Sequence, residues 1–489
     1  MVKITNTLSG EKEEFVPVGD VVRMYVCGMT PKFHPHVGHA RIFVAADILR
    51  RYLEYRGYAV RHVQNFTDID DKIIARANAE HRRPEEVAKE YSDSYFEAMD
   101  ALNVLRAHEY PTVTSTMPAI IAFVQGLVES GHAYVGASEP GSTGGRDVWF
   151  AVETFPSYGE LAGREATLDE QNIGVRVELE PGKRDPRDFA LWKSAKPGEP
   201  AWDSPWGPGR PGWHIECSAM VRQTLGDTID IHGGGRDLIF PHHENERAQS
   251  EALLGKVFVR YWAHAGLVET AGGEKMSHSL ENFQTVHDLL KVYDPMALRL
   301  YLLQTHYRAP LTFREDALAA AAQGLARLRG AAEAIPVGNA GGGPSAISSP
   351  SEMGGPAEGP PSPAGPAAEA RARFEAAMDD DFNTSGALAA LFDLAKDINS
   401  RRQVPAAAAE VTVEQATLRE LAGVLGLDLT PRQAAAPAGA EPFVELLLTV
   451  RQELRAAKQW ALADRIRDGL RERGVVVEDH PGGSTWHFE

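Results

Sequence analysis

Cysteine is nearly absent from this sequence of 489 residues, which contains only Cys27 and Cys217. Two cysteines cannot build the disulfide framework of many secreted domains, and their scarcity favours a reducing, cytoplasmic compartment. Long apolar runs are also missing, since the best local run, Leu446 to Val450, is far shorter than the roughly 20 residues of a membrane helix. The segment Met1 to Phe15 is polar and lacks the apolar core of a secretory signal. We therefore expect a cytoplasmic protein without a membrane partner.

Positive charge is the minority sign, because 50 Lys and Arg residues face 68 Asp and Glu residues and the net charge is −18. This balance argues against a broad basic surface for non-specific DNA binding, so we expect no DNA partner. It leaves RNA open, because screening at cellular salt acts over about 8 Å and a local basic face can still bind phosphates.

Several common active-site signatures are missing from the sequence. There is no G-x-x-x-x-G-K-[ST] loop, no G-x-G-x-x-G after a strand and no G-x-S-x-G nucleophile elbow. The pair His243-Glu244 does not continue as a zinc-protease motif, because Arg247 stands where the second histidine is needed. The chemistry of this chain must therefore be sought in other residues.

The length predicts about three domains at roughly 150 residues each, and 43% hydrophobic residues suffice for a large core. The clearest boundary is residues 336–366, in which 8 Gly, 8 Pro and 5 Ser occur among 31 residues. Such a segment cannot bury apolar surface and is typical of a flexible linker. We predict an α/β region over 1–335 and a mainly helical region over 367–489.

The α/β region contains two sets of strand, helix and strand. Val21 to Cys27 is an apolar strand candidate, Gly38 to Arg56 has helical spacing and Ala59 to Phe66 alternates again. The second set is a strand at Thr228 to His232, a helix from about Pro241 to Leu254, and a strand within Val257 to Val268. This pattern predicts a Rossmann-like parallel sheet with halves at about 20–110 and 225–290. Residues from about 110 to 225 look like an irregular insertion.

His36-Val37-Gly38-His39 lies in the loop after the first strand, where the following helix begins. A helix N-terminus offers unpaired N–H groups and partial positive charge, so it binds phosphate readily. Gly38 allows close approach of a ligand to the backbone. From this tetrapeptide alone, a phosphate site and a loop that merely contains histidines are equally compatible.

A second candidate is the loop Lys275-Met276-Ser277-His278-Ser279, which follows Gly272-Gly273. A mobile loop that carries a lysine can close over a triphosphate and stabilise charge on the leaving pyrophosphate. The alternative is a solvated loop lysine.

A third candidate is a scattered set of metal-ligand residue types. Cys27 and Cys217 are joined by His242 and Glu246, which share one helix face at spacing i, i+4. Cys, His and Glu are suitable zinc ligands, although this spacing is not that of a zinc finger. Two buried structural thiols remain the alternative.

Taken together, these segments resemble the cysteinyl-tRNA synthetases, a family of class I aminoacyl-tRNA synthetases, over nearly the whole chain. The matching segments follow one another in the family's order: Tyr25 to Gly28, His36 to Arg41, Asn65 to Lys72, Gly212 to Met220, Asp230 to Gly235, Phe240 to Glu246, Lys275 to Ser279, Met378 to Thr384 and Glu478 to Trp486.

The resemblance implies a role for each candidate residue. It implies catalytic roles for His36, His39 and Lys275, with Gly38 and His278 also in the ATP site. It implies one zinc ion per chain. The implied zinc ligands are Cys27, Cys217, His242 and Glu246, with His242 chosen over His243. It also implies that Thr67 and Trp213 lie beside the substrate cysteine.

The resemblance further implies the reaction and the partners. Cysteine would be activated by ATP with Mg²⁺ to cysteinyl-adenylate and pyrophosphate, and then transferred to tRNA(Cys). Zinc would grip the substrate thiolate and so exclude serine. Residues 1–335 would be the catalytic domain with a region of about 290–335 near the tRNA stem, and 367–489 would bind the anticodon. We expect a monomer.

The sequence departs from the family's usual K-M-S-K-S loop, because His278 replaces the second lysine. A histidine has a reference pKa of about 6.5, so we expect altered pH dependence rather than loss of activity. Two alternatives stay open: a cysteine ligase that acylates an amino sugar, as in mycothiol biosynthesis, and a noncatalytic RNA- or zinc-binding paralogue.

Overall fold

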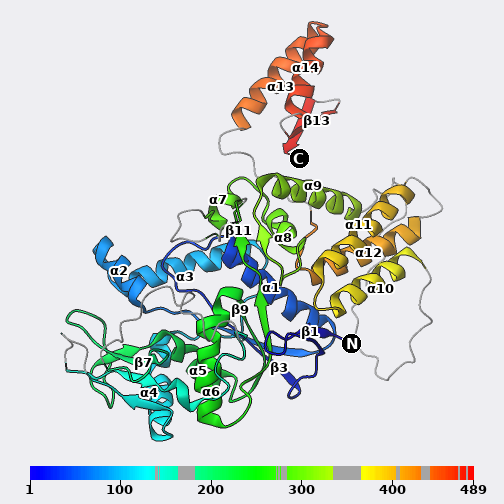
Figure 1. Cartoon of the computed structure of the whole chain (residues 1–489). Helices are drawn as coiled ribbons and strands as arrows, with labels where there is room; N and C mark the ends of the chain where they lie inside the picture. Colours follow the sequence, from blue (N-terminus) through cyan, green and yellow to red (C-terminus); the bar gives the residue numbers. More distant parts are fainter. Residues whose placement is uncertain are drawn as a thin grey trace, which may run out of the picture. The chain divides into compact units, whose positions relative to one another are not determined.

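The structure of the chain is a computed structural model (Figure 1). It describes residues 1–137, 141, 144–163, 182–270, 272–273, 276, 283–333, 365–402, 408–430, 441–471, 474–480 and 483–488. By its internal contacts the chain divides into unit 1, Met1–Leu429, and unit 2, Thr430–Glu489. Lys275, His278 and all but the last two residues of the predicted linker 336–366 lie outside the described residues.

A four-stranded parallel sheet forms the centre of unit 1. Its strands lie in the order β10 (Val259–Ala265), β9 (Ile229–Gly235), β3 (Val21–Val26) and β4 (Ala59–Gln64). The last three residues of β3 and all seven of β9 are buried, as expected for strands covered on both faces. The sheet confirms the predicted Rossmann-like parallel architecture.

Two helices make the crossovers of this sheet. α1 (Val37–Tyr55) joins β3 to β4, and α6 (Glu244–Leu254) joins β9 to β10. α1 ends where Gly57 adopts a φ of 87°, a conformation that glycine accepts without strain. α6 begins at Glu244 rather than near Pro241, because a π-helical turn over Ile239–His243 precedes it and contains an extended residue, Phe240.

α2 (Asp71–Glu80) and α3 (Pro84–Ala101) follow β4 within the first half. The described residues of the insertion predicted at about 110–225 form helices and strands, so the prediction of an irregular segment is wrong for them. α4 (Val113–Glu129) is followed by a second sheet, and α5 (Trp213–Thr224) leads back to β9. This sheet is antiparallel, in the order β5 (Ala133–Val135), β6 (Val148–Phe150), β7 (Phe189–Ser194) and β8 (Gly209–Pro211). Its strands are short and the edge strand β8 ends in proline, so they leave little periodicity to read.

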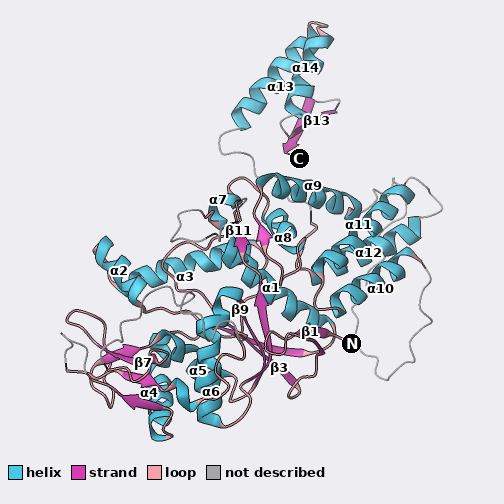
Figure 2. Cartoon of the chain, in the orientation of Figure 1, coloured by secondary structure: helices cyan, strands magenta, loops and turns pink. Residues whose placement is uncertain are grey.

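Helices dominate the rest of unit 1 (Figure 2). They are α7 (Val286–Leu290), α8 (Pro295–Leu303), α9 (Glu315–Ala332), α10 (Pro366–Asp379), α11 (Thr384–Arg401) and α12 (Ala408–Val424). Two short pairs of strands, β1 (Lys3–Thr5) with β2 (Lys12–Glu14) and β11 (Val268–Glu269) with β12 (Leu311–Thr312), flank them. Leu298, Phe374 and Leu421 belong to the same hydrophobic core as Val26 and Val44, so these helices pack with the parallel sheet.

Unit 2 consists of two helices and a hairpin. α13 (Glu441–Ala456) and α14 (Trp460–Arg471) precede the antiparallel strands β13 (Val475–His480) and β14 (Gly483–Phe488). Val444, Leu448, Leu470 and Val475 form its small core. The mainly helical C-terminal region is confirmed, and the closing hairpin is an addition that helical periodicity does not reveal. Among the described residues, no helix combines the length and apolar character needed to cross a membrane.

Candidate active site

The reversal of strand order in the parallel sheet lies between β3 and β9. Ligands of such sheets bind outside the carboxyl ends of the strands at this point. Cys27 directly follows β3, and its backbone N–H donates to the carbonyl of Gly233 in β9 at 3.0 Å. Gly28 lies so close to the backbone of Asn65 beyond β4 that a Cβ there would collide with it. The sheet thus places the first candidate ligand where a site is expected.

The four predicted zinc ligands come together at this edge of the sheet. Cys27 follows β3, Cys217 lies on α5, His242 lies in the π-helical turn and Glu246 lies on α6. Their ligand atoms are all within 4.8 Å of one another, and all four side chains are buried. The Cys27 Sγ lies 3.6 Å from the Cys217 Sγ and 3.4 Å from the Glu246 Oε1, which lies 3.0 Å from the His242 Nε2.

These distances fit a single zinc ion held by the four side chains. Two thiolates at 2.3 Å from one zinc ion lie roughly 3.8 Å apart, close to the observed 3.6 Å. A disulfide would need about 2.05 Å, and both cysteines are free. Two sulfur, one nitrogen and one oxygen atom form a donor set typical of zinc. The cluster can therefore hold a metal ion, and zinc suits it.

The ionisation of the cluster also suits a cation. The pKa of Cys217 falls to about 6 because the Cys27 thiol donates a hydrogen bond to it, whereas burial raises the pKa of Cys27. The charges of His232 and His242 outweigh burial and hold the pKa of Glu246 well below its usual range. Burial lowers the pKa of His242, but the charge of Glu246 outweighs it and raises that pKa to about 10. A bound metal ion would displace the proton of His242.

A second group of possible ligands overlaps the first. Cys27, His232, His243 and Glu246 also have ligand atoms within 4.8 Å of one another. The His232 Nε2 lies 2.9 Å from the Glu246 Oε2, and the His243 Nε2 lies 3.9 Å from the Glu246 Oε1. The His243 Nδ1 in turn contacts the His264 Nε2 at 2.8 Å. His232 can orient Glu246 from behind, as outer-shell groups do in metal sites, whereas His243 lies on the Oε1 side without a hydrogen bond to it.

The sequence predicts no role for His214, His232 or Glu216, although they lie in the matching segments Gly212 to Met220 and Asp230 to Gly235. His232 is fully buried within β9, and His214 lies 3.0 Å from His242 between their Nδ1 atoms. The available signal was a polar residue at a core position of an apolar strand, because buried polar groups need partners. α6 shows the same signal, since every residue from Glu244 to Ser250 is buried.

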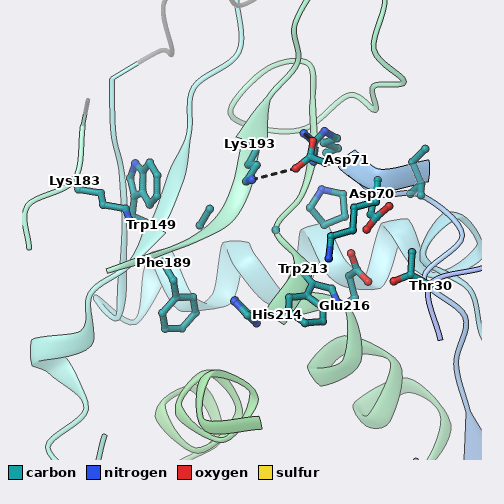
Figure 3. A pocket seen from close by; sticks show the side chains of 16 residues that line it. Thr30, Asp70, Asp71, Trp149, Lys183, Phe189, Lys193, Trp213, His214 and Glu216 are labelled. Carbon is teal, nitrogen blue, oxygen red and sulfur yellow. Dashed lines mark hydrogen bonds and ion pairs between the residues drawn. The ribbon is translucent and has the colours of Figure 1, made fainter. Parts of the chain in front are cut away.

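A cavity of about 370 Å³ opens beside this cluster (Figure 3). Trp213, Glu216 and Thr30 line one part of it, and the Lys193–Asp71 ion pair lies at another. The Trp213 ring stacks on His242 with centroids 4.3 Å apart and is 44% exposed. Thr67 is buried, and its hydroxyl donates to the Glu216 Oε2 at 2.9 Å. Of the two residues predicted to lie beside the substrate cysteine, Trp213 lines the cavity directly. Thr67 is connected to the cavity by its hydrogen bond to Glu216, which lines it.

The predicted phosphate motif lies at the start of α1. His36 is the N-cap, and its Nδ1 accepts the N–H of Gly38 at 3.0 Å. The His39 Nδ1 accepts the N–H of His36 at 3.3 Å, and the two rings stack with centroids 3.9 Å apart. A neutral imidazole that accepts at Nδ1 carries its proton at Nε2, so that atom is a donor. A Cβ on Gly38 would lie 2.7 Å from the His36 Cε1, so this capping arrangement requires glycine.

Matches to three family models cover most of the chain. Residues 14–323 match the class I (C) catalytic domain of tRNA synthetases, residues 373–430 match the DALR domain and residues 439–486 match the cysteinyl-tRNA ligase anticodon binding domain.

A solved methionyl-tRNA synthetase of Mycobacterium tuberculosis, in complex with methionyl-adenylate, shares the fold at a TM-score of 0.56. The match covers 83% of this chain and 90% of that chain at 17% identity. A LeuRS of Agrobacterium radiobacter matches with a TM-score of 0.55 at 13% identity, over 85% of this chain and 84% of that one. The fold and the family models together define a class I aminoacyl-tRNA synthetase.

Curated relatives identify the family within this class. A cysteine–tRNA ligase of Moorella thermoacetica is 50% identical over 98% of both chains, and one of Dehalococcoides mccartyi is 47% identical over 100% of both. This chain belongs to the cysteine–tRNA ligase family of class I synthetases, and it is an enzyme. The comparisons confirm the resemblance found in the sequence, and the anticodon-domain match gives no support to an amino-sugar ligase.

Proposed function

We propose that this enzyme activates cysteine with ATP and Mg²⁺ and transfers it to the 3′ end of tRNA(Cys), with zinc as the selector of the substrate thiol. The observation that carries the proposal is the buried cluster of Cys27, Cys217, His242 and Glu246 at the carboxyl edge of the parallel sheet, beside a cavity. These four residues would hold one zinc ion per chain.

Zinc bound there would take the substrate sulfur as a thiolate, which a serine hydroxyl replaces poorly. The chain's own residues would complete the pocket. Trp213 stacks on His242 and would shield that side of the cluster from water. Thr67 and Glu216 form a hydrogen-bonded pair within the same wall, and they would orient the amino-acid backbone. Selection by a polar site of this kind needs no editing domain.

The adenylation step would depend on charge stabilisation and alignment, because a carboxylate is already a nucleophile. His36 and His39 would donate from Nε2 to phosphate oxygens at the N-terminus of α1, whose N–H groups add partial positive charge. Gly38 allows this approach. Lys275 and His278 would stabilise the leaving pyrophosphate, and Mg²⁺ would neutralise the triphosphate.

The transfer step would bring the terminal hydroxyl of the tRNA to the adenylate. Unit 2 supports tRNA binding, because it matches an anticodon-binding family model and carries Arg465, Arg467 and Arg471 on α14. We propose residues 1–335 as the catalytic domain and 367–489 as the anticodon-binding and C-terminal region, with 336–366 as linker. We also propose a cytoplasmic monomer.

A charging assay tests the function. Purified enzyme with labelled cysteine, ATP and either tRNA(Cys) or an amino-sugar acceptor should label the tRNA alone. Label on the amino sugar would replace the proposal with the mycothiol-type alternative. If neither product is labelled and no pyrophosphate is released, the protein would be a noncatalytic paralogue.

A further inference from the structure

Arg299 on α8 is a fully buried arginine outside the site described above. Its Nε donates to the carbonyl of Leu425 at 2.8 Å, and one terminal nitrogen donates to the carbonyls of Leu102 at 2.9 Å and Asn103 at 3.1 Å. The other terminal nitrogen pairs with the carboxylate of Asp47. A planar guanidinium with every nitrogen bonded fixes the relative positions of all these partners.

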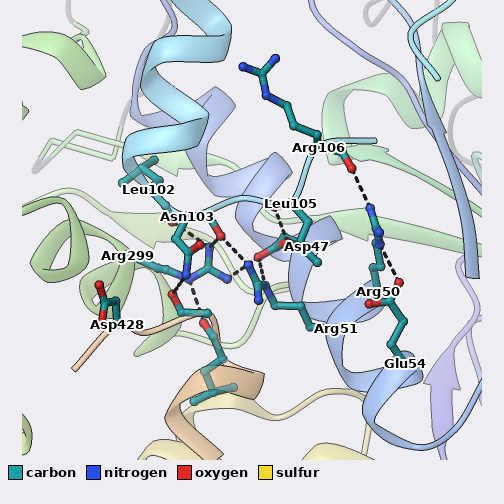
Figure 4. Close-up of polar contacts among 12 residues, drawn as sticks. Asp47, Arg50, Arg51, Glu54, Leu102, Asn103, Leu105, Arg106, Arg299 and Asp428 are labelled. Atoms are coloured by element: carbon teal, nitrogen blue, oxygen red, sulfur yellow. Dashed lines mark hydrogen bonds and ion pairs between the residues drawn. The ribbon is translucent and has the colours of Figure 1, made fainter. Parts of the chain in front are cut away.

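Arg299 and its partners come from four segments of unit 1 that are far apart in sequence (Figure 4). They are α1, the segment 102–105 after α3, α8, and the segment 425–428 after α12. We call the residues that join them the Arg299 junction: Asp47, Arg51, Leu102, Asn103, Leu105, Arg299, Leu425 and Gly426.

Two residues close the junction on the side of the segment 425–428. The Asn103 side chain donates to the carbonyl of Gly426 at 2.8 Å. Gly426 has a φ of 65°, and a Cβ there would collide with the Arg299 guanidinium. Both features restrict the segment to one conformation against Arg299.

Asp47 anchors α1 in the junction. Its Oδ1 accepts the N–H of Leu105 at 2.9 Å, and its Oδ2 accepts from Arg51 at 2.8 Å as well as from Arg299. Although burial opposes ionisation, Arg299 and Arg51 hold the pKa of Asp47 below its usual value. The carboxylate therefore stays charged, and charge-assisted bonds hold it from three directions.

α1 is the helix whose first turn carries His36 and His39. From the junction it runs without interruption to Val37, so a displacement of Asp47 along the helix axis moves the whole first turn. The segment 425–428 lies just before the end of unit 1 at Leu429, and the chain continues into the unit that matches the anticodon-binding model. The junction thus links the phosphate end of α1 to the segment that leads into unit 2.

We infer that Arg299, Asp47 and Asn103 are positioning residues for the adenylation step, which set the place of His36 and His39 through α1. This inference rests on the proposed roles of those two histidines. A displacement of about 1 Å in aligned groups can cost roughly a hundredfold in rate. The cysteine pocket is built from the ends of β3, α5 and α6 and shares no residue with the junction, so its affinity should not depend on Arg299.

The test compares variants of the full chain in cysteine-dependent ATP–pyrophosphate exchange. Arg299→Lys keeps the charge but cannot reach all four partners, and Asn103→Gly removes one hydrogen bond while glycine keeps the positive φ of 55°. We expect kcat to fall roughly tenfold to a hundredfold in Arg299→Lys and less in Asn103→Gly, with the KM for cysteine within about twofold of the parent.

The matched control is Glu414→Gln, which breaks a partly buried ion pair with Arg401 between α11 and α12 and involves no residue of the junction. It should lower the melting temperature but leave kcat unchanged. Should Arg299→Lys fail to fold, Asn103→Gly decides alone. Variants that melt earlier yet keep the parent's kcat, or that raise the KM for cysteine as much as they lower kcat, would overturn the inference. A parent without exchange activity would instead refute the proposed function.

Discussion

At the scale of single residues, Glu246 shows how the candidate zinc site is organised. Its Oε1 faces His242 and Cys27, whereas its Oε2 is held by His232 at 2.9 Å. One oxygen can therefore bind metal while the other is fixed from behind. The sequence could supply these ligands through the family resemblance, but the role of His232 depends on β9 and α6 meeting in space.

Variants of the neighbouring histidines distinguish the two overlapping ligand groups. His242→Gln should reduce bound zinc far below one ion per chain, because it removes a direct ligand. His243→Gln should keep nearly all of it. Metal analysis of dialysed protein measures both. Loss of zinc in His243→Gln with retention in His242→Gln would assign the ion to the group that contains His232 and His243.

A glycine substitution tests the phosphate end of α1. In Gly38→Ala the new Cβ would lie 2.7 Å from the His36 Cε1, so His36 must leave its capping position. We expect a loss of kcat/KM for ATP of about tenfold to a hundredfold in pyrophosphate exchange. The matched control is Gly330→Ala in α9, where nothing lies within 4 Å of the new Cβ. It should keep full activity and gain up to about 1 kcal/mol of stability. Equal activity of the two variants would contradict the role given to Gly38.

At the scale of elements, the parallel sheet was predictable and the insertion was not. β3 is a mainly apolar run and β9 begins with Ile229 and Ile231 in alternation; each is followed by a helix, a pattern that depends on local sequence. The sheet β5–β8 depends on pairing between segments far apart, such as Trp149 with Ala190. Strands of three residues carry too little alternation to reveal such pairing.

The strand β4 also carries a group that should make stability depend on pH. His62 is buried, and desolvation lowers its pKa to about 3. The unfolded chain, with a pKa near 6.5, binds one more proton than the folded chain between these values. The free energy of unfolding must therefore fall as the pH falls below about 6.5.

Removing the imidazole should flatten this dependence. When the pH is lowered from 7.5 to 5, the free energy of unfolding of His62→Leu should fall by about 2 kcal/mol less than that of the parent. Urea unfolding at the two pH values measures the difference. Equal losses in parent and variant would show that His62 does not titrate in this way.

At the scale of the whole molecule, composition and packing divide the chain differently. The Gly-, Pro- and Ser-rich stretch 336–366 suggested a boundary, yet α10 and α11 pack into unit 1. Asp381 explains part of this, because it accepts from the Thr5 N–H at 2.8 Å and from the Tyr307 hydroxyl at 3.0 Å. These contacts bridge 376 and 74 residues and leave no local signature in the sequence.

Removal of unit 2 should separate the two reaction steps. A chain that ends at Leu429 retains the parallel sheet and the zinc cluster, so it should keep cysteine-dependent pyrophosphate exchange. Its rate of tRNA charging should fall at least about tenfold, because each lost side-chain contact to a tRNA base costs about 1–3 kcal/mol of binding free energy. Charging at the full rate by this chain would show that unit 2 contributes nothing to tRNA binding.

The central claim is that a metal ion on Cys27, Cys217, His242 and Glu246 selects the substrate sulfur. The most direct test is the ratio of kcat/KM for cysteine to that for serine in pyrophosphate exchange, measured on zinc-loaded and on zinc-stripped enzyme. The loaded enzyme should favour cysteine by a factor of about 10⁴ or more, beyond what an apolar pocket gives. The stripped enzyme should lose most of that preference and regain it when zinc is restored. An undiminished preference for cysteine in metal-free enzyme would contradict the account.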